Sequence, residues 1–97
     1  MLMWIRVARG RVDPARIDEN STFGQDITAA FRQLPGFQSF MSGTDRATGQ
    51  VITVSTFDTE EHARFSRDAL GGDIQSRMQA RGTQVDPPEF YEVAIQA

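Results

Sequence analysis

Arg6 and Trp4 are the residues of this chain whose types and spacing point most directly to chemistry. They stand two residues apart in an apolar run that is typical of a β-strand, so both side chains should lie on one face. An arginine on an apolar strand costs free energy if it is buried without a partner. We therefore weigh two roles for Arg6: an ion pair with Glu92, or contact with an anionic or phenolate oxygen of a ligand.

Two further side chains could move a proton. His62 is the only histidine of the sequence, and histidine is the side chain that most readily exchanges a proton near neutral pH. Its place directly after an acidic helix cap also fits a purely structural role. Tyr91 could hydrogen-bond an aromatic substrate through its hydroxyl, although a strand tyrosine with a satisfied hydroxyl is the commoner case.

Large apolar side chains could form the walls of a pocket for a flat ligand. The candidates are Phe40, Met41, Phe65 and Met78, together with Trp4. Packing in an ordinary hydrophobic core is the default explanation of the same residues. The apolar strand at 50–57 also carries Thr and Ser on one face, which is compatible with a lined cavity or with ordinary β-propensity.

The sequence predicts neither a metal site nor a cofactor. The acidic residues of segment 58–61 are explained as helix caps, and no second cluster of ligand side chains accompanies them. Since the chain has no Cys, thiolate nucleophiles, thiolate metal sites and disulfides are excluded.

Composition restricts the class of protein. A chain of 97 residues with 39% hydrophobic side chains is expected to form one globular domain, 1–97. The net charge of −3 argues against a nucleic-acid partner, and the exclusive use of Arg over Lys indicates a GC-rich bacterial genome. The apolar N-terminal run ends at Arg6, too early for a signal peptide or a membrane span, so we expect a cytoplasmic protein without a membrane partner.

The hydrophobic patterns predict six elements in the order β-α-β-β-α-β. Strands are expected at 2–9, 37–43, 50–57 and 90–95, and the first helix at 14–34 (weak near 20–24). The second helix is expected in two pieces, 59–70 and 73–80, because Gly71 and Gly72 interrupt it. Segment 45–49 fits a hairpin loop with Gly49 in a left-handed conformation. This order predicts an α+β, ferredoxin-like fold in which a four-stranded antiparallel sheet carries both helical segments on one face.

Two helices cannot cover both faces of such a sheet. The first, third and last strands nevertheless carry apolar residues on both faces. A bare apolar face would be a large exposed patch in a chain of this size. We therefore predict a homodimer in which two sheets pack together, with Ile5 or Val7 at the interface unless the strand parity is reversed.

Five segments resemble the antibiotic biosynthesis monooxygenase-like family of the dimeric α+β barrel superfamily. They are 13–19, typical of short single-domain bacterial members, and 35–37, 45–50, 54–63 and 90–93. The resemblance covers nearly the whole chain and concerns mainly structural positions: a helix end, a hairpin and a helix cap. It implies a homodimer whose sheets form a barrel, with one small pocket per subunit between sheet and helices.

Within that family, some relatives oxidise polycyclic aromatic compounds with molecular oxygen and no cofactor, whereas another branch degrades haem. The haem-degrading branch uses an Asn near the position of Arg6, a Trp in the second helix and a His far along it. This chain has no Trp in that helix, and His62 lies in its first turn. These three departures from the haem-degrading branch argue against haem. The family's frequent Trp at the end of the third strand is Phe57 here.

Two classes of function remain open. The protein could be a cofactor-independent monooxygenase, in which Arg6 stabilises a phenolate and His62 or Tyr91 moves the proton. It could instead be a non-catalytic dimeric module that binds a small molecule or serves a structural role. An enzyme should contain a cavity with convergent polar groups near Arg6, whereas a purely structural module should have a filled interior.

Overall fold

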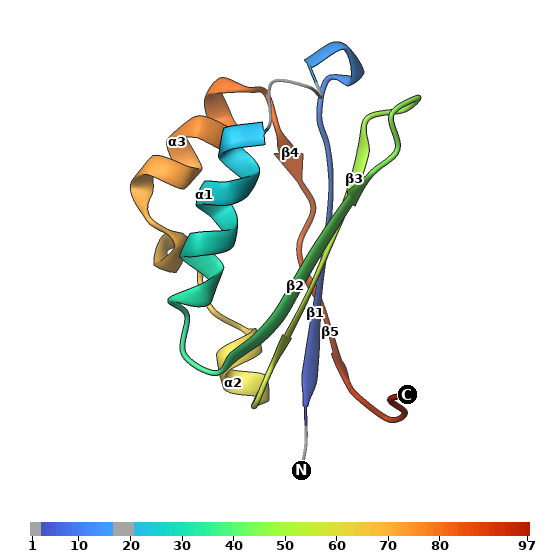
Figure 1. The fold of residues 1–97 in the computed structure, drawn as a ribbon, viewed down its shortest axis with the longest axis vertical. Helices are drawn as coiled ribbons and strands as arrows, with labels where there is room; N and C mark the ends of the chain where they lie inside the picture. The colour runs from blue at the N-terminus through green and yellow to red at the C-terminus, as the bar shows by residue number, and fades with distance from the viewer. Residues whose placement is uncertain (1–2, 17–20) are drawn as a thin grey trace.

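One sheet and one layer of helices make up the protein (Figure 1). The computed structural model describes residues 3–16 and 21–97. The elements are β1 (Trp4–Arg11), α1 (Ser21–Arg32), β2 (Phe37–Thr44), β3 (Gln50–Phe57), α2 (Glu60–Ala63), the 3₁₀ turn η2 (Arg67–Leu70), α3 (Gly72–Ala80), β4 (Gln84–Val85) and β5 (Glu89–Glu92). This architecture confirms the predicted ferredoxin-like α+β fold.

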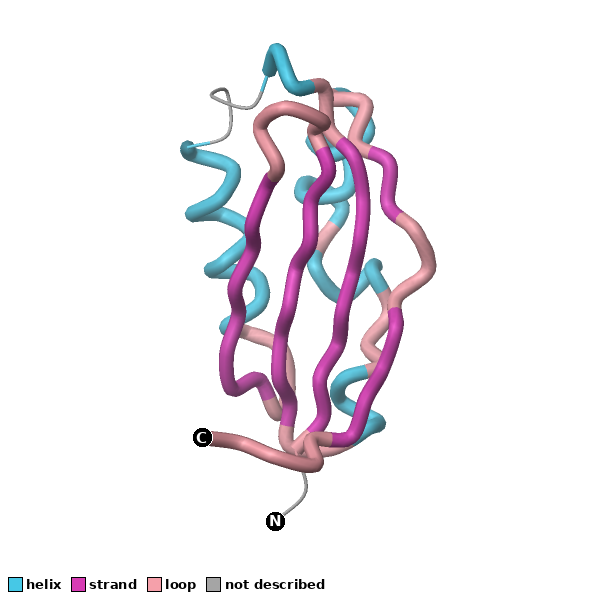
Figure 2. The backbone as a smooth tube through the Cα atoms, turned by 90° about the vertical axis from the view of Figure 1, so that its right-hand side faces the viewer, coloured by secondary structure: helices cyan, strands magenta, loops and turns pink. Residues whose placement is uncertain are grey.

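The sheet has the strand order β2-β3-β1-β4, and β5 also pairs with β1. Every pairing is antiparallel, and β1 matches β3 along their full length, from Trp4 opposite Phe57 to Arg11 opposite Gln50. Seen from the sheet side, the strands form one layer, and none of the helices lies in front of it (Figure 2). One face of the sheet is therefore covered by the chain's own helices, and the other face is not.

The last predicted strand, 90–95, has the wrong bounds. β5 ends at Glu92, and the additional short strand β4 pairs with β1 before it. The two are separate because Pro87 and Pro88 have no N–H groups with which to continue the ladder to β1. Asp86 N donates to Arg9 O at 2.8 Å before the break, and Val93 N donates to Met3 O at 2.8 Å after it. The interruption adds a fifth strand to the four that were predicted.

The hairpin between β2 and β3 has the predicted loop. Gly49 adopts a φ of 80°, and two backbone hydrogen bonds of 2.8 Å, Asp45 N to Gln50 O and Gly49 N to Asp45 O, close the turn. Glycine takes this left-handed conformation without the steric cost of a Cβ. The loop sets the register of β2 on β3 and thereby decides which of their side chains face the helices.

The predicted first helix, 14–34, is shorter than expected. Asp13 does begin a turn, since Ala15 N donates to its Oδ1 at 2.9 Å, but this is a single 3₁₀ turn over 14–16. The α-helix itself begins at Ser21. The predicted helical residues 17–20, including Ile17, lie outside the described residues.

The predicted continuous helix at 59–70 is wrong, and Arg6 explains why. Thr59 caps α2, but the α-helix ends at Ala63. Arg6 Nη1 donates to Ala63 O at 2.8 Å and to Phe65 O at 3.0 Å. A continuing α-helix would need those same carbonyls for its own i→i−4 hydrogen bonds. The chain therefore leaves the helix and forms η2 and then α3.

The hydrophobic core lies between the sheet and the helices. Its buried members Phe31, Leu34, Phe57 and Ala63 come from α1 and the turn after it, from β3 and from α2. Phe31 contacts the rings of Phe40 and Phe65 at centroid separations of 4.5 and 5.5 Å. Phe31 of α1 and Leu34, in the turn after it, both face the core. Within the described part of the chain, no helix has the length and apolar character needed to cross a membrane.

Candidate functional site

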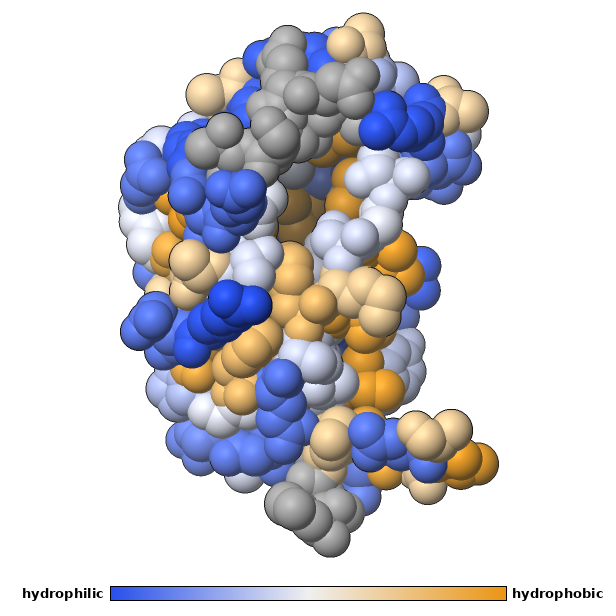
Figure 3. Space-filling model, viewed as in Figure 1, coloured by the Kyte–Doolittle hydropathy of each residue, from blue (hydrophilic) through white to orange (hydrophobic). Residues whose placement is uncertain are grey.

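The space between the sheet and the helix layer contains a cavity of about 270 Å³. Its walls are mainly apolar and include Phe23, Ile27, Phe31, Phe40, Phe65 and Met78. Hydrophobic side chains can be seen inside a hollow between the two layers (Figure 3). A concave, mostly apolar site with a few polar groups is the usual form of a small-molecule site.

Arg6 is the buried charged group at the wall of this cavity, and only 7% of its surface is exposed. Its guanidinium carbon lies 3.8 Å from the ring centroid of Phe65, and both of its hydrogen bonds come from Nη1. Burial, and secondarily the charge of Arg67, lowers the pKa of Arg6 to about 10. Arg6 therefore remains a cation at neutral pH, held by carbonyl groups and by an aromatic ring.

The predicted ion pair between Arg6 and Glu92 is wrong. Glu92 lies opposite Trp4 in the register of β1 and β5, whereas Phe90 lies opposite Arg6. The described residues provide Arg6 with carbonyl acceptors and no carboxylate. Of the two roles considered for Arg6, contact with a ligand is the one that this geometry leaves open.

Other polar groups of the cavity come from several elements. Arg67 of η2 and Arg81, which follows α3, are cationic, and Asp86 is the only carboxylate that the described lining contains. The hydroxyls of Ser42 and Thr53 lie 3.3 Å apart on neighbouring strands of the sheet. Across residues 3–16 and 21–97, no group of three or more His, Cys, Asp or Glu side chains could hold a metal ion.

The structure brings together some of the predicted substrate contacts. Phe40, Phe65 and Met78 line the cavity with Arg6. Trp4 shares the face of Arg6 as expected, but it packs against the buried core cluster and is not part of the lining. Met41 is 71% exposed and belongs to the opposite face of the sheet.

Tyr91 lies on the opposite face of the sheet from Arg6. It neighbours Phe90, whose register position is that of Arg6, and successive side chains of a strand point to opposite faces. Its hydroxyl donates to Glu89 Oε1 at 2.6 Å, which raises the pKa of Tyr91. The geometry therefore does not place Tyr91 beside a ligand that contacts Arg6.

His62 lies at the start of α2 and outside the cavity lining. Its Nδ1 is 2.6 Å from Asp58 Oδ1, and Thr59 Oγ1 accepts a hydrogen bond from its backbone N–H at 3.1 Å. Gly36, with a φ of 73°, packs directly against this pair, and a Cβ there would collide with both side chains. These contacts hold the turn that follows α1 against the start of α2, which is a structural role.

Sequence reasoning missed Arg67 and most of the cavity wall from α1. Phe23, Ile27 and Phe31 have the spacing of an ordinary buried stripe, which gives no sign that space is left beside them. Thr53 did carry a signal, because it is a polar residue on the face of β3 that lines the cavity. Arg67 could have been suggested only by its nearness in sequence to Phe65.

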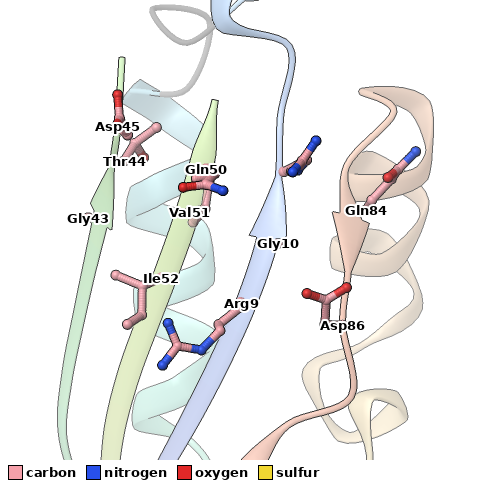
Figure 4. A pocket seen from close by; sticks show the side chains of 11 residues that line it. Arg9, Gly10, Gly43, Thr44, Asp45, Gln50, Val51, Ile52, Gln84 and Asp86 are labelled. Atoms are coloured by element: carbon pink, nitrogen blue, oxygen red, sulfur yellow. The ribbon is translucent and has the colours of Figure 1, made fainter. Parts of the chain in front are cut away.

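A second, larger depression of about 490 Å³ lies at one end of the uncovered sheet face. Arg9 and Ile52 project from the strands there, with the helices behind them (Figure 4). Arg9 pairs with Glu89 at 2.9 Å, and its side chain is 57% exposed. This depression contains no buried charge, so we take the inner cavity beside Arg6 as the candidate site.

No protein-family model matches the sequence, and no curated protein sequence does either. Solved structures match it over nearly its whole length. They include SnoaB, a cofactor-independent oxygenase from Streptomyces nogalater, with 17% identity, a TM-score of 0.64 and 97% and 95% of the two chains covered. A monooxygenase from the gene ActVA-Orf6 of Streptomyces coelicolor, in complex with nanaomycin D, has 17% identity, a TM-score of 0.67 and 99% and 89% covered.

A third similar structure is a candidate antibiotic biosynthesis monooxygenase from Bordetella bronchiseptica. It has 15% identity, a TM-score of 0.68 and complete coverage of both chains. Identities this low establish a common fold and leave the chemistry to be argued from the site. The chain thus has the fold of the antibiotic biosynthesis monooxygenase-like proteins, in agreement with the resemblance of its sequence segments.

Proposed function

We propose that the protein is a cofactor-independent monooxygenase that oxidises a small phenolic aromatic compound in the cavity beside Arg6. One observation carries the proposal: a buried guanidinium without a carboxylate partner in the described structure stands at the wall of an aromatic cavity. Burying a cation in this way costs stability, and functional groups are often kept at such a cost. The similar structures of a cofactor-independent oxygenase and of a monooxygenase support a monooxygenase reaction.

The chemistry follows from the charge of Arg6. A cation close to a phenol favours the phenolate and lowers the pKa of the phenol. The electron-rich phenolate ring then supplies the electrons that reduce molecular oxygen. In the overall reaction a ring CH₂ becomes C=O with one oxygen atom, and the second oxygen leaves as water with the two hydrogens. Arg6 holds the anion, and the apolar walls exclude bulk water.

Cavity size limits the substrate. Sites for drug-sized ligands usually measure about 300–1,000 Å³, so a cavity of about 270 Å³ fits a compound of two or three fused rings. Phe31 and Phe40, whose ring centroids are 4.5 Å apart, provide part of an aromatic wall. Flat ligands pack well against such rings.

The protein is further proposed to act as a homodimer that covers the open face of the sheet. Met41, Ile52 and Tyr91 are exposed there by 71%, 37% and 50%. A second copy that packs its sheet against this face would bury them and leave the inner cavity accessible on the helix side. Light scattering at micromolar concentration should give twice the chain mass of 10.8 kDa. A monomer under these conditions would disprove the dimer.

Oxygen uptake with 1,8-dihydroxyanthrone tests the reaction, because this compound has two phenols and an oxidisable ring CH₂. We expect one O₂ consumed per molecule oxidised, at a rate that rises with the concentration of the wild-type protein. Arg6→Met should reduce the rate at least about tenfold, since a charge-assisted contact to the phenolate is lost. Arg32→Met, which removes an exposed arginine at the end of α1, serves as the matched control.

The binding arm of the test uses nanaomycin D, together with 5-hydroxy-1,4-naphthoquinone and 1,4-naphthoquinone. The wild type should prefer the hydroxylated naphthoquinone, and Arg6→Met should lose that preference. Binding without protein-dependent oxygen uptake would favour the alternative, a non-catalytic small-molecule-binding module. That alternative has one observation in its favour: His62 and Tyr91, the two expected proton carriers, lie outside the cavity lining.

A further inference from the structure

The cavity contains a second cation near Arg6. Arg67 comes from η2, the 3₁₀ turn that follows the carbonyls to which Arg6 donates, and it lines the same cavity. Both residues line the same cavity, and the charge of Arg67 contributes, after burial, to the low pKa of Arg6. Two like charges that share one apolar cavity repel each other unless an anion lies between them.

Three other arginines of the described structure pair with carboxylates. Arg9 pairs with Glu89 at 2.9 Å and Arg64 with Glu60 at 2.9 Å. Arg77 lies 2.6 Å from Asp26. By contrast, neither Arg6 nor Arg67 forms an ion pair with any residue that the structure describes.

We propose that Arg6 and Arg67 together bind the carboxylate and the adjacent phenolate oxygen of an aromatic hydroxy acid. The substrate class is then a fused-ring compound with a carboxyl group next to its hydroxyl, and both oxygens lie on the edge that faces the two arginines. This inference rests on the proposed function in taking the cavity as the substrate site. It adds a specific second anionic group to the phenol.

The two arginines contribute differently. Arg6 is fixed in place by two carbonyls and by the ring of Phe65, so it is preorganised for an anion. Arg67 is exposed and can approach the carboxylate from solvent. Guanidinium groups bind carboxylates through paired N–H donors, which makes the contact both strong and directional. Since Arg67 is exposed, its contribution should weaken as salt concentration rises.

Three naphthalene probes separate the groups involved: 1-hydroxy-2-naphthoic acid, 1-naphthol and 2-naphthoic acid. We expect calorimetry to show that the wild type binds the hydroxy acid at least about tenfold more tightly than 1-naphthol. Arg67→Gln should reduce this preference to less than about threefold and leave the affinity for 1-naphthol unchanged. Raising the salt concentration should weaken binding of the two acids and not of 1-naphthol.

Arg32→Gln is the matched control, because it removes an exposed arginine outside the cavity, and it should retain the full preference. Arg67→Glu should reverse the preference towards 1-naphthol. Thermal melting of each variant verifies that the fold is intact, which we expect because residue 67 is exposed. Equal wild-type affinity for the hydroxy acid and 1-naphthol would overturn the inference. An Arg67→Gln variant that kept the full preference for the hydroxy acid over 1-naphthol would overturn it too.

The inference and the proposed function can fail separately. 1,8-Dihydroxyanthrone has no carboxylate, so its oxidation tests the reaction without involving the two-arginine site. If the hydroxy acid binds selectively and no oxygen uptake occurs, the two-arginine site stands and the monooxygenase assignment falls. If oxidation occurs and the carboxylate gives no preference, the reverse holds. Failure of every naphthalene probe to bind would overturn the inference.

Discussion

The two faces of the sheet are built from alternating residues of the same strands, yet their contents are opposite. On the helix side, Arg6 and Ser55 are buried at 7% and 1% exposure, next to Phe57 at 0%. On the open side, Met41 and Ile52 are exposed. Polar groups are thus hidden where packing is closest, and aliphatic groups face solvent. This difference is the basis of the two proposals made above, a ligand site on the helix side and self-association through the open side.

The largest effect is expected on the helix side of this comparison. Phe57→Ala removes a fully buried ring that contacts Phe37 and Phe65, and it should lower the free energy of unfolding by about 3–5 kcal/mol. Urea unfolding measures this value. Ile95→Ala, at a site that is 92% exposed, should change it by less than about 0.5 kcal/mol. Similar losses at both sites would refute this description of the core.

A smaller effect, on the affinity of the proposed dimer, is expected when a charge is introduced on the open side of the sheet. Val7 lies opposite Val54 and next to buried Arg6, so its side chain points to the uncovered face. Val7→Asp should weaken the proposed dimer at least about 100-fold, which corresponds to about 3 kcal/mol, because the interface would bury an unpaired carboxylate. Sedimentation equilibrium measures the change.

Ser76→Asp, an exposed position on α3, provides the matched charge on the helix layer and should leave the dimer intact. A dimer that tolerated Val7→Asp as well as Ser76→Asp would show that the copies associate through another surface.

Removal of a hydroxyl group should change the free energy of unfolding in opposite directions on the two faces of the sheet. Ser55 Oγ is buried and has no hydrogen-bond partner in the described structure, so Ser55→Ala should be neutral or stabilise by up to about 1 kcal/mol. Thr56 Oγ1, on the open side, lies 2.6 Å from Ser39 Oγ, and Thr56→Ala should destabilise by about 0.5–1 kcal/mol. Chemical denaturation of both variants measures the direction of each change in the free energy of unfolding. Destabilisation by Ser55→Ala would reveal a partner for its hydroxyl.

The smallest effect is expected on the pH dependence of stability, through Glu89. The pKa of Glu89 lies below its ordinary 4.5 because Tyr91 and Arg9 donate to its carboxylate. A depressed folded-state pKa means that the carboxylate stabilises the fold above pH 4.5 and ceases to do so as pH falls through the lowered pKa. Melting temperatures should therefore show Glu89→Gln slightly below the wild type at pH 7 and equal to it in strong acid. A gap that persisted in acid would have a different cause.

Local signals predicted most of the fold. The β-branched run at 50–57 and Gly49 gave β3 its observed bounds and its hairpin. Thr59 caps α2 as its residue type suggested. These features depend on neighbours within a few positions, which is the range that a sequence pattern can resolve.

Contacts between distant segments were beyond such signals. The end of α2 at Ala63 depends on the Arg6 side chain, which is 57 positions away. The face of Tyr91 depends on strand parity, where a shift of one residue reverses the result. Within the site, Arg6, Phe40 and Phe65 could be named from residue type, but Arg67 required the folded arrangement of η2 around the cavity.

Gly36 has a consequence for how the sequence can diverge. Any side chain at this position would meet Asp58 and His62, so a replacement becomes acceptable only together with changes at those two positions. Lineages accumulate substitutions one at a time, and an intermediate with a side chain at 36 would be destabilised by both the collision and the positive φ. Glycine should therefore be retained at position 36 as long as Asp58 and His62 are present, even among descendants whose cavity residues have changed.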